Sequence, residues 1–171
     1  MARNVEIKAR VAELVSLRER VDPLATAPAC LLHQTDTFFR VPRGRLKLRQ
    51  FADGSGELIF YERPDRKGPK LSSYRVIPVG DPGDLTALLV QALGVRGVVK
   101  KKRELFLVGR TRVHLDEVEG LGSYLELEVV LADGESEAEG QVEARDLLAR
   151  LGIASSQLVR EAYIDLLART A

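Results

Sequence analysis

Charged side chains recur at every second residue along several segments of this sequence, and they are the groups most able to do chemistry. In residues 4–11 the odd positions are all apolar and the even positions are all polar or charged. Alternate side chains of a β-strand point to the same side, so such a segment collects its charges on one face. Cations gather on the middle segments, and carboxylates on the first and last. The residues of this parity are Glu6, Lys8 and Arg10; Arg45, Lys47 and Arg49; Tyr61 and Arg63; Ser73 and Arg75; Lys101 and Arg103; Arg112, His114 and Asp116; and Tyr124, Glu126 and Glu128.

The residue types on these faces suit a polyanion held together with a divalent cation. A guanidinium group makes bidentate contacts with phosphate, and an ammonium group is a compact point charge. Mg²⁺ and Mn²⁺ prefer oxygen ligands, commonly carboxylates together with phosphate oxygens and water. Two carboxylates spaced two residues apart on a strand point the same way and could share an ion. The strongest arginine candidates are Arg49, Arg63, Arg103 and Arg112, and the candidate metal ligands are the pair Glu126 and Glu128 joined by Glu6 and Asp116.

Plainer explanations compete with a binding face. An antiparallel sheet commonly turns one face to water, so polar alternation is expected by itself. A solvated face, however, tends to mix Thr, Ser, Glu and Lys, whereas these charges are segregated by sign. The run Lys100–Arg103 could be a nucleic-acid patch, but in a strand only alternate members of the run share a face. His114 could act as an acid or base by type, yet a lone strand histidine is more often a structural hydrogen-bonding group.

Composition excludes several classes of protein. The net charge of +1, from 26 Lys+Arg against 25 Asp+Glu, argues against a bulk electrostatic grip on nucleic acid. The chain has no Ser/His/Asp or Cys/His arrangement, no Gly-rich phosphate-binding loop and too few His and Cys residues for zinc. Cys30 is the single cysteine, and apolar stretches such as 87–90 are far below the roughly 20 residues of a membrane-spanning helix. We therefore expect a cytoplasmic protein with no membrane insertion.

Turns and periodicities around the charged faces predict eight strands and four helices. Tight turns between consecutive strands favour an antiparallel sheet, and closing it into a barrel leaves the charged face lining the hole. The 171 residues contain no repeat and fit one α+β domain over residues 1–171, an eight-stranded antiparallel β-barrel with flanking helices. Strands are expected at 4–11, 33–41, 44–52, 56–63, 71–79, 98–108, 110–117 and 123–132. Helices are expected at 14–21, at 85–93 before Gly94, at 142–151 before Gly152, and at 158–166 with Ser156 as N-cap.

Seven blocks of the sequence also stand in a recognisable order. The first is Asn4-Val5-Glu6-Ile7-Lys8, and the last is Tyr163-Ile164-Asp165-Leu166-Leu167. Between them lie 34–39 with 44–49, Val99-x-Lys101-x-Arg103, 112–122, and Tyr124-x-Glu126-x-Glu128. Together they resemble the blocks of the CYTH superfamily, whose members include class IV adenylyl cyclases, thiamine triphosphatases and inorganic triphosphatases. The resemblance covers essentially the whole chain.

The resemblance implies a β-barrel of the triphosphate tunnel type, in which basic residues hold a triphosphate and acidic residues hold Mg²⁺ or Mn²⁺. Two departures from the family pattern stand out: Asn4 replaces the first Glu of the E-x-E-x-K signature, and Ser73 lies where triphosphatase members often have an acidic residue. Carried over by position, the metal ligands are Glu6, Asp116, Glu126 and Glu128. The triphosphate ligands are Lys8, Lys47, Arg49, Arg63, Lys101, Arg103 and Arg112, to which the parity argument adds Arg75, and Glu6 and Lys8 are assigned as catalytic.

Three functions share such a scaffold. The first is a class IV adenylyl cyclase-like conversion of ATP to cyclic AMP and pyrophosphate, because the blocks at 114–122 and 163–167 resemble that branch most. The second is hydrolysis of inorganic, thiamine or nucleoside triphosphate. The third is binding of triphosphate or polyphosphate without catalysis, motivated by Asn4 and Ser73. Each makes the partner a small triphosphate and not a nucleic acid or a membrane, and a homodimer stays open.

Overall fold

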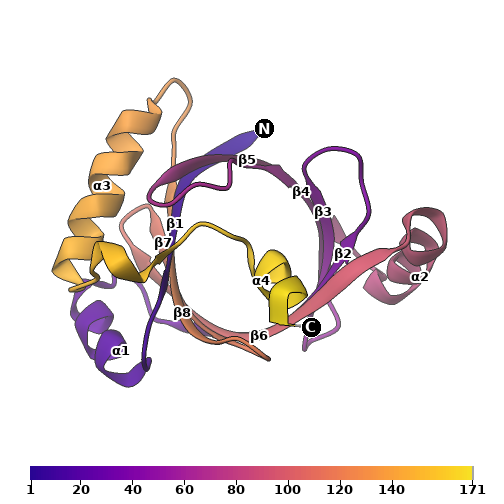
Figure 1. The fold of residues 1–171 in the computed structure, drawn as a ribbon, viewed down its shortest axis with the longest axis horizontal. Helices are drawn as coiled ribbons and strands as arrows, with labels where there is room; N and C mark the ends of the chain where they lie inside the picture. Colours follow the sequence, from indigo (N-terminus) through magenta and orange to yellow (C-terminus); the bar gives the residue numbers. More distant parts are fainter. Residues whose placement is uncertain (171) are drawn as a thin grey trace.

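β-strands make up most of the chain in the computed structural model, which describes residues 1–170. Eight long strands form a ring around a central hole, with the helices outside or across one opening (Figure 1). The strands are β1 (Ala2–Arg10), β2 (Cys30–Phe39), β3 (Arg45–Phe51), β4 (Gly56–Glu62), β5 (Lys70–Val79), β6 (Val95–Val108), β7 (Thr111–Val118), β8 (Gly122–Val130) and the short β9 (Leu158–Val159).

All neighbouring strands are antiparallel, in the order β5-β4-β3-β2-β6-β7-β8-β1-β9. The additional pairing of β5 with β1 closes the barrel. Its register places Glu6 opposite Lys70, and on the other side of β1 Glu6 lies opposite Glu128. The expected eight-stranded antiparallel barrel is therefore confirmed, and each of the eight strands begins and ends within a few residues of its predicted bounds.

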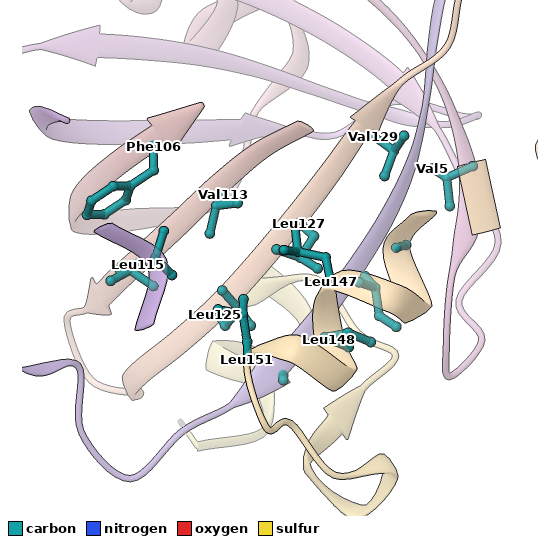
Figure 2. Packing of buried hydrophobic residues seen from close by; sticks show 14 of the residues in the cluster. Val5, Phe106, Val113, Leu115, Leu125, Leu127, Val129, Leu147, Leu148 and Leu151 are labelled. Atoms are coloured by element: carbon teal, nitrogen blue, oxygen red, sulfur yellow. The ribbon is translucent and has the colours of Figure 1, made fainter. Parts of the chain in front are cut away.

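The outer face of one half of the barrel carries the larger apolar core. The odd residues Val5, Ile7 and Ala9 of β1 point outward and are almost completely buried. They pack with outward residues of β7 and β8 against α1 (Val15–Val21) and α3 (Glu137–Arg150), as Figure 2 shows for α3. Because the outer face is covered by helices, the charged face of the same strands is left to line the hole.

α3 lies unusually close to β1. A Cβ added at Gly140 would lie 2.7 Å from Val5 Cγ2 and 2.8 Å from Leu131 Cδ2, so a larger residue would push the helix away. The helix begins with a capping box in which Ser136 and Glu139 satisfy each other's backbone N–H groups. Gly152 follows the helix at a φ of 68°, the left-handed conformation expected of a C-terminal cap.

α2 (Pro82–Leu93) covers the outside of the barrel near β2 and β3. The Asp81 side chain caps its first turn by accepting a hydrogen bond from the Asp84 N–H at 2.9 Å. Gly94 ends the helix at a φ of 74°, and β6 begins at the next residue. The helix predicted before Gly94 is confirmed.

The predicted helix over 158–166 is wrong. Residues Ser155–Gln157 form a 3₁₀ turn, Leu158–Val159 form β9, and α4 begins only at Tyr163 and runs to Thr170. β5 pairs with β1 only as far as Glu6, so the edge of β1 beyond it would leave backbone groups unpaired. β9 fills that edge opposite Lys8 and Ala9, and Ser156 is therefore not a helix N-cap.

The chain then crosses one opening of the barrel, where α4 lies in Figure 1. Its Tyr163 and the preceding Ala162 line the interior, and α4 packs against β6. Among the described residues, no helix is long and apolar enough to cross a membrane.

Candidate active site

The barrel interior holds a cavity of about 320 Å³, which we call the tunnel. Side chains from all eight long strands line it, and α4 contributes Tyr163. The ionisable lining residues other than tyrosine are Glu6, Lys8, Asp36, Lys47, Arg49, Glu57, Arg63, Lys101, Arg103, Arg112, His114, Glu126 and Glu128. The structure thus brings together every site residue predicted from the sequence except Arg75 and Asp116.

Arg75 lies outside the tunnel, which corrects its prediction as a triphosphate ligand. It is exposed on β5, and the residues of this strand that line the tunnel are Ser72, Tyr74 and Val76. Ser73 has the same outward parity as Arg75. A shift of one residue turns every side chain of a strand to the opposite face. Apolar residues occupy both parities of β5, so its pattern could not fix the direction.

Asp116 belongs to the wall behind the tunnel surface, which corrects its prediction as a metal ligand. Its carboxylate accepts two hydrogen bonds of 2.7 Å, from Arg103 Nε to Oδ1 and from Arg103 Nη2 to Oδ2. The Tyr163 hydroxyl donates a further bond of 2.8 Å to Oδ2. Burial alone would raise the pKa of Asp116, but the Arg103 cation holds it below its usual value. Asp116 therefore fixes the direction of Arg103.

Carboxylates cluster on the wall formed by β1 and β8. Glu6 and Glu128 are direct neighbours across the two strands, and so are Lys8 and Glu126. Glu126 lies between two cations, with Oε2 at 3.0 Å from Lys8 Nζ and Oε1 at 3.2 Å from Arg103 Nη2. Burial by itself would raise the pKa of Glu126, but Lys8 and Arg103 hold it well below its usual value. Glu126 is therefore charged at neutral pH.

The other two carboxylates of this wall each have an arginine. Arg63 Nε lies 3.0 Å from Glu6 Oε1, and Arg112 Nη2 lies 2.7 Å from Glu128 Oε2. Burial raises the pKa of Glu6, against the opposing effect of Arg63. These pairs hold both arginines at the edge of the acidic wall, within reach of an anion in the tunnel.

His114 joins Glu126 and Glu128 in a group that fits a divalent metal ion. One ligand atom from each of the three lies within 4.8 Å of the others. His114 Nδ1 is buried and makes no hydrogen bond of normal length among the described residues, although Glu126 Oε1 lies 3.6 Å from it. Burial lowers the pKa of His114, so the imidazole is neutral at pH 7 and can act as a ligand. The two carboxylates suit Mg²⁺ or Mn²⁺, whereas an imidazole ligand is more typical of transition metals than of Mg²⁺.

The sequence interpretation left His114 out of the site, although the signal was present. His114 has the same parity as Arg112, and it lies directly opposite Glu126 across β7 and β8. Only the register reveals that pairing, because the two residues are separated by a turn whose length does not fix it. A strand histidine facing an E-x-E pair is the pattern that would have included it.

The opposite wall, on β2, β3 and β6, carries a basic cluster around one carboxylate. Asp36 Oδ2 accepts from Lys47 Nζ at 2.8 Å and from Lys101 Nζ at 2.9 Å. Arg49 donates from Nε to Oδ1 at 2.8 Å and from Nη2 to Oδ2 at 3.0 Å. We call these four residues the Asp36 cluster. Sequence reasoning missed Asp36, although it shares its parity with Gln34 in a block that resembled the family.

The Asp36 cluster carries more positive than negative charge. Burial alone would raise the pKa of Asp36, but Arg49, Lys101 and Lys47 hold it well below its usual value. Burial lowers the pKa of Lys101 to about 7, which Asp36 opposes and Arg49 promotes. Three basic groups thus share one carboxylate, so this wall carries excess positive charge that a bound anion would neutralise.

The two ends of the tunnel differ. At the end near β9, Tyr163 lies under Lys8, whose Nζ is 3.8 Å from the ring centroid. Arg63 Nη1 and Lys70 Nζ both donate to the Arg160 carbonyl at 3.2 Å, which ties the crossing segment to the barrel. At the other end the lining is largely apolar and includes Val76, which is 41% exposed. The tunnel is therefore covered at one end and open to solvent at the other.

Asn4 occupies the tunnel face, as its parity with Glu6 predicts. It is 3% exposed, and its Oδ1 has no hydrogen-bond partner among the described residues. A carboxylate in this place would be a second acidic residue on β1, beside Glu6. The neutral amide leaves the acidic wall with Glu6, Glu126 and Glu128.

Comparison with known proteins agrees with this geometry. The model of the CYTH domain family matches residues 2–163. Adenylate cyclase CyaB of Aeromonas hydrophila is 28% identical over 138 residues, which cover 76% of this chain and 70% of that protein. The solved PH1012 protein of Pyrococcus horikoshii OT3 is 25% identical with a TM-score of 0.85, covering 95% of this chain and 98% of that one.

A plant structure shows how far the fold extends. HpAC1 of Hippeastrum, described as a putative adenylyl cyclase with a dominant triphosphatase activity, has a TM-score of 0.69 at 16% identity. The match covers 99% of this chain and 96% of that one. At this identity the similarity is one of fold.

Proposed function

Because the chain belongs to the CYTH domain family, we propose that it is a divalent-metal-dependent enzyme acting on a triphosphate bound in the tunnel. The observation that carries this proposal is the placement of opposite chemistries within one cavity. The Asp36 cluster on β2, β3 and β6 faces the acidic wall of β1 and β8. A triphosphate together with its metal ion would satisfy both walls at once.

The residues present fit a metal ion on the acidic side. Glu126, Glu128 and His114 would hold it, and the partnerless His114 Nδ1 supports this assignment. Glu6, also predicted as a metal ligand, is the cross-strand neighbour of Glu128 but is not one of these three clustered residues. A bound Mg²⁺ or Mn²⁺ would polarise phosphate oxygens and neutralise charge that develops during phosphoryl transfer.

The chain's own cations would bind and orient the phosphates. Lys47, Arg49 and Lys101 present their donors from one wall. Arg103, held by its hydrogen bonds to Asp116, also lines the tunnel. Lys8, held between Glu126 and Tyr163, would neutralise charge beside the metal site. Phosphoryl transfer needs little beyond such positioning and charge neutralisation. We propose Glu6 and Lys8 as the residues nearest the reacting groups.

Adenylyl cyclase activity is the first candidate reaction. The ribose 3′-hydroxyl of ATP would lose its proton and attack the α-phosphorus, and the bond to the pyrophosphate group would break. The similarity to a relative named adenylate cyclase supports this reading. The open, apolar end of the tunnel also leaves room for a nucleoside outside the phosphate site.

Hydrolysis of inorganic, thiamine or nucleoside triphosphate is the second candidate. The same fold is described with a dominant triphosphatase activity in HpAC1, so the barrel by itself is compatible with both reactions. In this reaction water attacks the terminal phosphorus, the bond from that phosphorus to the bridging oxygen breaks, and the products are orthophosphate and the remaining diphosphate. A binder without turnover is the third candidate, since Asn4 lowers the number of carboxylates on β1.

Phosphorus NMR of the products separates these reactions. The protein is incubated with Mg²⁺ or Mn²⁺ and, in turn, ATP, thiamine triphosphate and inorganic triphosphate. Cyclic AMP with pyrophosphate is the expected result, orthophosphate without cyclic AMP would replace the cyclase by a triphosphatase, and binding without turnover would favour the binder. Failure of every triphosphate to bind would overturn the proposal.

Matched variants connect the activity to the tunnel. Glu128→Ala and Arg103→Ala should each lose most of the activity while remaining folded, because both residues line the tunnel. Glu117→Gln is the control, since Glu117 lies on β7 next to Asp116 with its side chain 60% exposed. Full activity in both tunnel variants would show that the reaction occurs elsewhere.

A further inference from the structure

Asp36 places a negative charge beside the proposed binding site for a polyanion. Such a charge is expected to repel the ligand and weaken its binding. Asp36 lies on the basic wall, it is 1% exposed, and it is surrounded by Lys47, Arg49 and Lys101. By net charge alone, removing it would make this wall a stronger site for phosphate. Its burial shows that it is not a free acceptor in competition with the ligand.

The geometry of its hydrogen bonds gives Asp36 a different role. Its two oxygens accept four bonds of 2.8–3.0 Å from side chains on β3 and β6. Arg49 uses Nε and Nη2 for this, which leaves Nη1 without an assigned partner among the described residues. Lys47 and Lys101 each use one of three ammonium protons. All three side chains line the tunnel, so the remaining donors are available to an anion there.

We propose that Asp36 is a positioning residue that holds Lys47, Arg49 and Lys101 as a preorganised cradle for phosphate oxygens. The inference rests on the proposed function and deepens it. Lysine and arginine side chains lose considerable rotamer freedom when they are fixed in one geometry. Asp36 fixes all three before the ligand arrives, so the loss does not weaken ligand binding. The carboxylate also limits repulsion between three closely spaced cations.

The charge of the cradle depends on the same residue. Lys101 faces Asp36 on β2, Lys47 and Arg49 on β3, Arg103 on its own strand, and the Tyr163 ring at 5.9 Å. Asp36 is the main group that raises the pKa of Lys101, and Asp116 on β7 is a second carboxylate that interacts with the Lys101 charge. Loss of the Asp36 carboxylate therefore favours the neutral form of Lys101. The cradle then carries less positive charge than the formal charges of its three basic side chains would give.

The sign of one affinity change tests the proposal. Binding of inorganic tripolyphosphate is measured by isothermal titration calorimetry at pH 7 and a constant Mg²⁺ concentration. Asp36→Asn should weaken binding at least about tenfold, because up to three side chains must then be ordered by the ligand. Equal or tighter binding by Asp36→Asn would overturn the proposal, since net charge alone predicts that result.

A second pair of variants keeps the test decisive if Asp36→Asn folds poorly. The Lys47→Gln variant keeps Asp36 paired with Arg49 and Lys101. The double variant, Asp36→Asn with Lys47→Gln, keeps these two cations but has no carboxylate between them. Net charge predicts tighter binding by the double variant, whereas positioning predicts weaker binding. Thermal unfolding of each variant establishes that the measured protein is folded, and Glu117→Gln should bind like the wild type. Tighter binding by the double variant than by Lys47→Gln would also overturn the proposal.

The wild-type titration separates this inference from the proposed function. If wild-type protein does not bind tripolyphosphate, with or without metal, the proposed function fails. If it binds, and the Asp36 variants bind equally well, the proposed function stands and the positioning role of Asp36 is wrong.

Discussion

At the scale of single residues, the tunnel is organised by carboxylates that each serve a different purpose. Asp116 is enclosed and directs Arg103, and Asp36 gathers three cations. Glu126 and Glu128 instead share the cavity with the partnerless His114 Nδ1. The difference follows from the number of donors around each group. Asp36 accepts four hydrogen bonds and Asp116 three, whereas Glu126 has one cation at each oxygen and keeps lone pairs for a metal ion.

The two histidines of the chain allow a matched test of the metal site. His114→Ala should weaken binding of Mn²⁺ by about tenfold or more, because it removes one of three ligands. His33→Ala is the control, since His33 is exposed on β2. Isothermal titration with Mn²⁺ measures both variants. Equal affinity in wild type and His114→Ala would place the metal elsewhere.

Sequence alone located most tunnel residues because alternation assigns a face without knowledge of the fold. Glu6 and Lys8 followed from a strand with strict alternation. Asp36 and His114 were missed because their roles depend on residues from other strands, Lys101 for one and Glu126 for the other. Parity describes one strand at a time, whereas a site is made by the register between strands.

At the scale of elements, β5 and the C-terminal segment show where pattern reasoning fails. β5 has apolar residues on both faces, so alternation does not show which face is the inner one. Its outer face is partly exposed even at an apolar residue, because Ile77 is 51% accessible. The segment after α3 has helical spacing, but Leu158 and Val159 pair with β1 because its edge is otherwise incomplete. In both cases a tertiary contact outweighs the local periodicity.

The corrected register of β5 predicts a contrast between two arginines. Arg75→Ala should change the KM for the triphosphate by no more than about twofold, because an exposed side chain away from the site contributes little. Arg49→Ala should raise KM at least about tenfold, because it removes a charged donor from the Asp36 cluster. Steady-state kinetics with ATP or inorganic triphosphate measures both. A large effect of Arg75→Ala would mean that β5 is shifted by one residue.

At the scale of the whole molecule, the barrel separates an apolar outer layer from a charged interior. The helices α1 and α3 cover the outer face of β1 and β8, so this apolar core lies outside the ring (Figure 2). The charged side chains line the tunnel within it. Burying several cations together is unfavourable unless each has a counter-charge. This cost appears in the pKa of Lys101, which burial lowers to about 7.

The buried lysines of the tunnel, together with the buried Lys70 outside it, predict an unusual pH dependence of stability. Burial lowers the pKa of Lys70 to about 8 and that of Lys47 below its ordinary value. Between the folded pKa and the unfolded value near 10.4, the unfolded chain binds more protons, so stability rises with pH. The metal-free protein should therefore gain at least about 1 kcal/mol in free energy of unfolding from pH 7 to about pH 9.

Urea unfolding at a series of pH values measures this gain. Lys101→Met should reduce the rise, because it removes one of the groups that titrates in this window. Lys102→Met is the control on the same strand, since the Lys102 side chain is 51% exposed. A free energy of unfolding that stays level or falls from pH 7 to about pH 9 would contradict the account of the buried lysines.

The central claim is that a triphosphate and a divalent metal ion bind together inside the barrel. Crystals grown with Mn²⁺ and inorganic tripolyphosphate test it directly, because anomalous scattering locates the manganese independently of the phosphates. The account predicts a manganese peak beside Glu126, Glu128 and His114, with phosphate density between that peak and the Asp36 cluster. Phosphate bound only on the outer surface, or manganese away from the acidic wall, would contradict it.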